Sequence, residues 1–308
     1  MNKWTREAMP SLEGQVWVVT GANSGLGLET VKGLAARGAT VVMACRDPQR
    51  AQAAADEVKK LTANAKLELE SLDLASLASI DAFAKKLATT HPVIDGLINN
   101  AGIMAIPRRT TADGFEMQLG TNHLGHYALS MRLLPLLENA KAPRLVNVAS
   151  TAHKFGTMNF DDLMGEKSYS SWGAYGQSKL ANLLFTFELS RKLAAAGKKT
   201  VVAAAHPGYA ATNLQGVGAK MTGSKFGAWI MNVGNSVMAQ PADMGALPSL
   251  YAATASDVKS GDYFGPDGFM ELKGHPVKCG STKKAQDTAS AAKLWEVSEK
   301  LTGMRFPA

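Results

Sequence analysis

Cysteine and long apolar runs are scarce in this sequence. Its only cysteines, Cys45 and Cys279, lack C-x-x-C spacing, which excludes a disulfide framework and favours a reduced, cytoplasmic setting. No apolar run approaches the ~18 residues of a membrane-spanning helix, and residues 1–14 lack the apolar region of a signal peptide. We therefore expect a soluble cytoplasmic protein without a membrane span.

Clusters of like charge and low-complexity linkers are also lacking. The net charge is +7, but the densest basic spots are dipeptides, so a solvated surface is favoured and no nucleic-acid partner is expected. Strand-like and helix-like segments alternate without a linker rich in Pro, Ser or Gly. This pattern predicts one α/β domain over residues 14–308, preceded by an N-terminal extension over residues 1–13.

A glycine-rich turn separates the first strand-like run from the first helix-like run. The apolar residues 15–20, the helical pattern of residues 28–35 and a predicted strand over residues 40–45 form a βαβ unit. Glycines let the backbone approach a ligand closely, and the following helix offers free N–H groups to a phosphate; an ordinary tight turn is the alternative. The predicted dinucleotide site includes Gly21, Asn23, Ser24, Gly25, Leu26 and Gly27.

Arg46 directly follows the second predicted strand, where NAD-binding proteins commonly place an acidic residue for the ribose hydroxyls. A guanidinium binds a phosphate through two parallel hydrogen bonds, so Arg46 favours NADP(H) over NAD(H), although Asp47 adjoins it. A solvent-facing Arg46 without a ligand is the alternative.

Polar residues follow the other predicted strands as well. The Asp73 carboxylate, with Leu74 beside it, is placed to accept a hydrogen bond from an adenine amine. Asn100, Ala101 and Gly102 suit a packed cofactor, although turn chemistry also explains them. Polar strand ends at one edge predict a single-domain Rossmann fold, a doubly wound parallel sheet with helices on both faces. The expected helices span residues 48–61, 76–89, 115–138 and 175–196, and the expected strands span residues 66–72, 94–99, 144–149 and 200–205.

Tyr175 and Lys179 lie four residues apart on a predicted helix, 25 residues downstream of Ser150. Residues at this spacing share a helix face, so the ammonium would stand beside the phenol and favour phenolate. Free tyrosine titrates near ~10, and acid–base work at neutral pH needs such a neighbour. Ordinary packing with a solvent-reaching lysine is the alternative for the pair taken alone.

These segments belong to a series of motifs in a fixed order. The series comprises Thr20-Gly21-xxx-Gly25-x-Gly27, Asn99-Asn100-Ala101-Gly102, Asn122, Ser150, Tyr175-xxx-Lys179 and Pro207-Gly208. Together they resemble the short-chain dehydrogenase/reductase superfamily over about residues 14–255. Residues 44–46, 121–126, 160–163 and 178–182 look like its retinol-dehydrogenase and protochlorophyllide-reductase branch, which is mostly NADP(H)-dependent.

The resemblance implies a role for each catalytic position. Tyr175 would be the general acid, and Ser150 would hydrogen-bond the substrate oxygen. Lys179 would lower the pKa of Tyr175 and hold ribose hydroxyls, while Asn122 would anchor a proton-relay water. The interval from Ser150 to Tyr175 exceeds the one common in the superfamily but is similar to that of the retinol-dehydrogenase-like branch.

The resemblance implies that the turn after the strand over residues 200–205 holds the nicotinamide carboxamide through Pro207, Gly208 and Thr212. It also implies hydride transfer at the 4-pro-S face. An ordinary helix N-cap is the alternative for Thr212.

The segment over residues 209–240 is rich in glycine, methionine and other apolar residues, which predicts a lipophilic lid. Core packing or a partner-helix interface is the alternative. The substrate would be a lipophilic carbonyl compound or alcohol, and Tyr169 lies in the insert that would help to line its pocket. The expected substrate positions are Ser150, Tyr175, Met164, Tyr209, Leu214 and Trp229.

The C-terminal region has no predicted chemical role. A final helix over residues 288–301 is expected to pack back on the domain, and His275 and Cys279 are interpreted as too isolated for a metal site. By the resemblance, the helices over residues 115–138 and 175–196 would form a dimer face, with a homodimer and a homotetramer both left open.

The leading function is that of an NADPH-dependent carbonyl reductase or alcohol dehydrogenase. A catalytically silent NADP-binding scaffold and a light-driven tetrapyrrole reductase are the alternatives. A scaffold needs the glycines but not Ser150, Tyr175 and Lys179, so their presence favours an enzyme.

Overall fold

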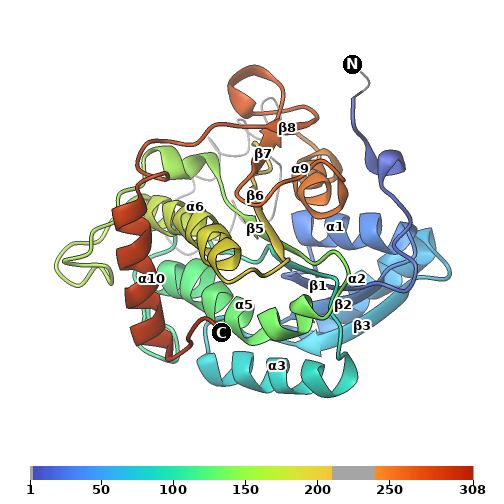
Figure 1. The fold of residues 1–308 in the computed structure, drawn as a ribbon, viewed down its shortest axis with the longest axis horizontal. Coiled ribbons are helices and arrows are strands. Elements are labelled where there is room, and N and C mark those ends of the chain that lie inside the picture. Colours follow the sequence, from blue (N-terminus) through green and yellow to red (C-terminus); the bar gives the residue numbers. More distant parts are fainter. Residues whose placement is uncertain (1–2, 210–239, 308) are drawn as a thin grey trace.

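A computed structural model describes residues 3–209 and 240–307 and has an eight-stranded sheet at its centre (Figure 1). The strand order is β3-β2-β1-β4-β5-β6-β7-β8, and all neighbours are parallel except β7 and β8. The chain reverses its winding direction between β1 and β4, where ligands of doubly wound sheets bind. The predicted fold class is confirmed. The strands are β1 (Val16–Thr20), β2 (Thr40–Cys45), β3 (Lys66–Ser71), β4 (Gly96–Asn99), β5 (Arg144–Val148), β6 (Val201–Ala205), β7 (Tyr263–Pro266) and β8 (Pro276–Lys278).

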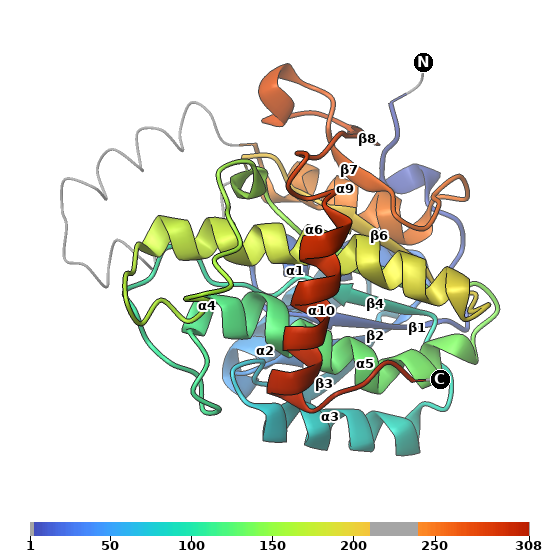
Figure 2. The same ribbon diagram turned by 60° about the vertical axis from the view of Figure 1, so that its left-hand side comes forward.

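Helices cover both faces of this sheet (Figures 1 and 2). On one face lie α1 (Gly25–Ala36), α2 (Pro48–Leu61) and α9 (Ala242–Thr254), and on the other lie α3 (Leu77–Thr90), α5 (Gly125–Glu138) and α6 (Ser171–Ala195). Each face has its own apolar core, because the central strands are buried on both sides. Among the helices of residues 3–209 and 240–307, none combines the length and apolar character that crossing a membrane requires.

Side-chain caps fix where several helices begin. The Asp47 carboxylate accepts hydrogen bonds from the backbone N–H groups of Gln49 and Arg50, and Pro48 occupies the first turn of α2. The Ser170 hydroxyl accepts a hydrogen bond from the Gly173 N–H group. As a result, α6 begins at residue 171, four residues before the predicted start at residue 175.

The predicted continuous helix over residues 115–138 is wrong in its first part. The Glu116 carboxylate caps a short helix, α4 (Met117–Leu119), and a π-helical turn, η2 (Gly120–Leu124), separates it from α5. A π-turn inserts an extra residue into the helical repeat and changes the direction of the side chains within it. This turn contains Asn122, one of the predicted catalytic residues.

The residues before the predicted domain pack on its core. Met9 and Leu12 are buried against the α1 face, after a short 3-10 helix, η1 (Arg6–Ala8). Arg6 forms an ion pair of 3.0 Å with Glu29 of α1. The segment up to residue 13 therefore contributes apolar contacts to the domain.

The C-terminal helix α10 (Thr288–Thr302) crosses α6 on the side away from the sheet (Figure 2). Its Trp295 is buried, with ring centroids 5.1 Å from Tyr127 of α5 and 6.0 Å from Phe185 of α6. The prediction that this helix packs back on the domain is correct. The helix α10 therefore covers part of the outer surface of α6 and contacts α5 at Tyr127, on the two helices that the resemblance assigned to a dimer face.

Candidate active site

A cavity of about 320 Å³ lies at the carboxyl ends of β1, β2 and β4. It is lined by all twelve residues that the glycine turn, Arg46 and the polar strand ends predicted there: Gly21, Asn23, Ser24, Gly25, Leu26, Gly27, Arg46, Asp73, Leu74, Asn100, Ala101 and Gly102. The structure thus brings together residues from four separate loops. Residues that sequence reasoning did not assign to this cavity include Arg50, Ile103, Met104 and Thr121.

The glycine turn has backbone positions that larger residues would not fit. Gly21 has φ +63°, and a Cβ atom on Gly27 would lie 2.2 Å from the Gly21 carbonyl oxygen. The N-terminus of α1 therefore packs directly against the turn and leaves its backbone open to the cavity. A glycine cradle, exposed helix N–H groups and a nearby guanidinium fit the pyrophosphate and ribose of a dinucleotide cofactor.

Thr20 connects this turn to the end of β4. Its buried hydroxyl oxygen accepts hydrogen bonds of 2.9 Å from the backbone N–H groups of Asn100 and Ala101. The Asn100 side-chain amide donates to the Thr20 carbonyl at 2.8 Å. The two halves of the cavity wall are therefore fixed to each other without a ligand.

Two exposed arginines, Arg46 and Arg50, stand at the wall of the cavity beside α2. Asp47 lies between them in sequence, and its Oδ1 atom accepts both α2 N-cap hydrogen bonds. Capping reduces the capacity of Asp47 to accept from ribose hydroxyls. The sequence signal for Arg50 was a second arginine in the first turn of the helix that follows Arg46.

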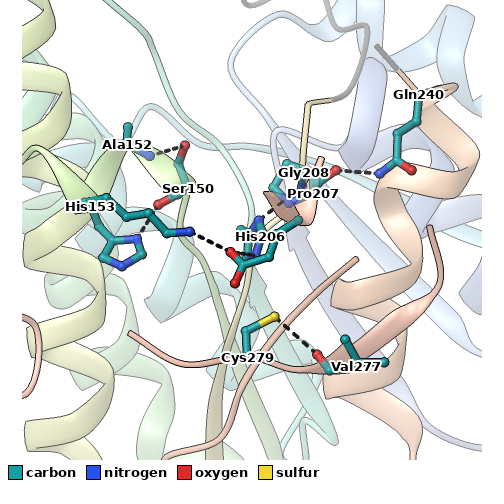
Figure 3. Close-up of polar contacts among 11 residues, drawn as sticks. Ser150, Ala152, His153, His206, Pro207, Gly208, Gln240, Val277 and Cys279 are labelled. Carbon is teal, nitrogen blue, oxygen red and sulfur yellow. Dashed lines mark hydrogen bonds and ion pairs between the residues drawn. The ribbon is translucent and has the colours of Figure 1, made fainter. Parts of the chain in front are cut away.

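Ser150 and Tyr175 lie together at the end of β5. Ser150 caps a short 3-10 helix, η3 (Thr151–Lys154), by accepting from the Ala152 N–H group at 3.2 Å (Figure 3). Burial raises the pKa of the Tyr175 phenol, and a hydrogen bond with Ser150 opposes this rise. The phenol is 6% exposed, so a proton that it donates goes to a partner inside the site.

Lys179 lies one turn further along α6, with its Nζ atom 5.9 Å from the centre of the Tyr175 ring. The Nζ atom donates a hydrogen bond of 2.9 Å to the Val148 carbonyl. Burial lowers the pKa of Lys179 to about 8, and Lys179 is not among the groups that shift the pKa of Tyr175. The lowering of the Tyr175 pKa by Lys179 stays a prediction, and burial is the largest influence on both groups.

Lys179 is nevertheless close to the cofactor cavity. A Cβ atom on Gly102, which lines the cavity, would lie 3.7 Å from the Lys179 Nζ atom. Lys179 thus adjoins the cavity that the glycine turn forms, whereas Ser150, Tyr175 and Asn122 are not among the residues that line it.

Asn122 is fully buried, and its side chain holds the segment after β4. Its Oδ1 atom accepts from the Ile103 N–H group at 2.9 Å, and its Nδ2 atom donates to the Ile103 carbonyl and to Ser178 Oγ. These bonds occupy the side chain with protein partners. The expected role in a water relay stays a prediction.

Sequence reasoning did not single out His126. This buried histidine connects the glycine turn to Asn122. Because Thr20 Oγ1 already accepts two N–H groups, its proton is directed to His126 Nε2 at 2.9 Å. His126 Nδ1 then carries the ring proton and donates to the Asn122 carbonyl at 3.1 Å. Burial lowers the pKa of His126 to about 4, so the ring is neutral at pH 7.

The turn after β6 is held from two sides (Figure 3). Gln240 Nε2 donates to the Pro207 carbonyl at 2.6 Å, and the Gly208 N–H group donates to His206 Nδ1 at 3.2 Å. The Tyr209 N–H group donates to the Leu272 carbonyl at 2.9 Å. Thr212, Leu214 and Trp229, with most of the predicted lid, lie outside the described residues.

Met164 and Tyr169, from the insert before α6, contact the loop that precedes α4. Met164 Sδ accepts from the Glu116 N–H group at 3.2 Å. The Tyr169 hydroxyl donates to the Ile106 carbonyl at 2.9 Å and accepts from Gln118 Nε2 at 2.9 Å. These contacts anchor the insert, and a substrate role for Met164 stays a prediction.

The interpretation of Cys279 as isolated is wrong. His275 is turned away and bonds the Trp4 carbonyl through Nδ1, but Cys279 lies with His206 and Glu271. The three side chains come from different segments between residues 206 and 279, and their separation in sequence concealed the cluster.

Comparisons with known proteins give one consistent family. Residues 15–222 match the model of the short chain dehydrogenase family. The human protein named retinol dehydrogenase 13 is 40% identical over 309 residues, covering 98% of this chain and 90% of that protein.

Solved structures agree in fold. A protein of Mycobacterium paratuberculosis is 44% identical with a TM-score of 0.83, and the match covers 100% of both chains. A gluconate 5-dehydrogenase-like chain from Beutenbergia cavernae, with NADP bound at low occupancy, is 27% identical with a TM-score of 0.60 over 79% of this chain and 91% of that one.

Proposed function

Because the chain belongs to the short-chain dehydrogenase family and is an oxidoreductase of that type, we propose that it transfers hydride between NADPH and the carbonyl carbon of a lipophilic aldehyde or ketone. The reverse reaction is oxidation of the corresponding alcohol. The observation that carries this proposal is the hydrogen bond between Ser150 and the buried Tyr175, with Lys179 beside Tyr175 and next to Gly102 of the glycine-lined cavity.

The preference for NADP(H) rests on charge at the cavity wall. Arg46 and Arg50 offer two guanidinium groups to a 2′-phosphate, while Asp47 is occupied as a helix cap. The Beutenbergia cavernae structure with NADP supports the cofactor class.

The chemistry of the residues follows from their positions. NADPH, when bound, supplies the hydride to the carbonyl carbon. Ser150 orients the carbonyl oxygen, and the Tyr175 hydroxyl gives its proton to that oxygen as negative charge develops there. Asn122 and His126 keep the segments around β4 and the glycine turn in a fixed arrangement before substrate arrives. Pre-formed geometry of this kind lowers the cost of reaching the transition state.

The substrate class is inferred from the apolar segment over residues 209–240 and from the retinol dehydrogenase named above. A segment rich in methionine and other apolar residues favours a lipophilic substrate. We further propose residues 14–308 as the catalytic domain and the cytoplasm as its location, in keeping with its two free cysteines.

The test is NADPH oxidation by the purified protein with aromatic, long-chain and retinoid aldehydes and ketones. We expect turnover with at least one lipophilic aldehyde, and a loss of about 10²-fold or more in Tyr175→Phe. NADPH binding, followed by the change in its fluorescence, should persist in that variant. Unchanged turnover in Tyr175→Phe would refute the mechanism, and NADPH binding without turnover would favour a silent scaffold.

A further inference from the structure

Three side chains of metal-ligand type meet beneath the turn after β6. They are His206 at the end of β6, Glu271 of a 3-10 helix, η4 (Phe269–Glu271), and Cys279 after β8. One nitrogen, one oxygen and one sulfur atom of these residues all lie within 4.8 Å of one another. His206 Nε2 is 3.5 Å from the Glu271 carboxylate, and Figure 3 shows His206 and Cys279 on neighbouring segments.

His206 is the most constrained of the three. Its ring is fully buried, and among residues 3–209 and 240–307 its Nε2 atom has no hydrogen-bond partner. The other nitrogen, Nδ1, accepts from the Gly208 N–H group at 3.2 Å. Buried polar atoms without a partner are rare and call for a functional explanation. The unpartnered atom lies 3.5 Å from the Glu271 carboxylate, and the Cys279 thiol belongs to the same cluster.

We propose that His206, Glu271 and Cys279 bind one divalent transition-metal ion of the zinc type. Imidazole nitrogen, carboxylate oxygen and thiolate sulfur are the ligands that Zn²⁺ prefers, at about 2.0–2.3 Å from the ion. Ligand atoms at these bond lengths are separated by roughly 3.3–3.8 Å in a tetrahedral site, so the cluster needs only a small contraction. When the metal ion binds the sulfur of Cys279, the thiol proton is released to solvent.

A positive charge already occupies one side of this cluster. The Lys154 ammonium is 2.9 Å from the Glu271 carboxylate, and its side chain is 48% exposed. Because Lys154 reaches solvent, it is able to move into water when an ion takes its place. The Glu271 side chain is 28% exposed, so a metal ion reaches the cluster from solvent on the side of Glu271.

Ion binding has a consequence for the turn. A metal bound at Nε2 takes the lone pair of that atom, so the ring proton resides on Nδ1, where the Gly208 N–H group now points. Two N–H groups cannot share a hydrogen bond, and the turn at residues 206–208 must shift. The effect on NADPH rests on the proposed function, in which the turn at residues 206–208 holds the cofactor. If it does, the metal ion and NADPH weaken each other's binding by the same factor.

The binding test is a titration of the purified, metal-free full chain with Co²⁺, followed by visible and near-ultraviolet absorption. We expect one ion per chain with a thiolate-to-cobalt band, displaced by Zn²⁺. Cys279→Ser should abolish the band, and Glu271→Gln should weaken binding about tenfold or more. The matched control is His91→Gln. His91 also contacts a glutamate, Glu68, at 2.7 Å, but no cysteine takes part in that contact.

Absence of the thiolate band in the parent chain would overturn the site. A band that survives unchanged in Glu271→Gln would also overturn it, because a thiol binding alone would then explain the spectrum.

A second arm measures NADPH affinity by fluorescence with and without Zn²⁺. We expect weaker NADPH binding with the ion in the parent chain and no change in Cys279→Ser. Equal NADPH affinity with and without bound Zn²⁺ would refute the coupling. If the metal-free protein fails to bind NADPH, the proposed function is refuted. In that case the Co²⁺ spectrum alone tests the metal site.

Discussion

Replacing Lys179 by methionine is expected to abolish turnover and to change how stability depends on pH. Burial lowers the pKa of Lys179 from 10.5 to about 8, so the folded protein holds this proton more weakly than the unfolded chain does. The contribution of Lys179 to the free energy of unfolding is therefore lowest below pH 8. It rises with pH until the lysine of the unfolded chain also loses its proton.

The magnitude follows from the shift in pKa. A difference of about 2.5 units corresponds to about 3 kcal/mol at 1.36 kcal/mol per unit. Methionine fills a similar volume without charge, and the Val148 carbonyl keeps the hydrogen bond of 3.2 Å from Asn182. The parent chain should therefore gain about 3 kcal/mol of stability relative to Lys179→Met between pH 8 and pH 10.5.

Urea unfolding of both proteins without cofactor, at several pH values across this range, measures that difference. The control is Lys85→Met, which replaces a lysine whose side chain is 77% exposed and lies outside the candidate site. A stability difference between the parent and Lys179→Met that stays constant from pH 7 to 10.5 would show that Lys179 keeps an ordinary pKa, and the reasoning would fail.

Three further predictions concern the cofactor cavity and the C-terminal helix. Alanine at Arg46 or Arg50 should weaken NADPH binding by about 1–3 kcal/mol while leaving NADH binding nearly unchanged, and equal losses for both cofactors in equilibrium titrations would contradict the 2′-phosphate role. Gly27→Ala should lower NADPH affinity at least tenfold, because the new Cβ meets a backbone oxygen at 2.2 Å, whereas Gly280→Ala, with open space around it, should bind normally in the same titration. Trp295→Ala should lower the free energy of unfolding by about 3–5 kcal/mol in urea melts, and a loss below 1 kcal/mol would mean that α10 is loosely held.

Local patterns were sufficient to predict the part of the site near the glycine turn. The strand, turn and helix around Gly21 to Gly27 are determined by neighbouring residues, and parallel strands bring their ends to one edge of a sheet. Asp73 and Asn100 therefore line the cavity as expected, although they come from different strands.

The remaining features depend on contacts between distant residues. The chain from Thr20 through His126 to Asn122 joins residues about 100 positions apart, and no local pattern marks it. The π-turn before α5 arises where the Asn122 side chain bonds the backbone of Ile103. The environment of Cys279 likewise emerges only when β8 pairs with β7.

The position of helix α10 also affects whether two copies of the chain can associate through α5 and α6. A second copy would have to compete with a segment of the same chain, and a tethered segment acts at an effective concentration in the millimolar range. Release of α10 would uncover Tyr127 and Phe185, whose rings now contact Trp295. Through this arrangement, the chain supplies its own competitor at the surface that the resemblance predicts for pairing.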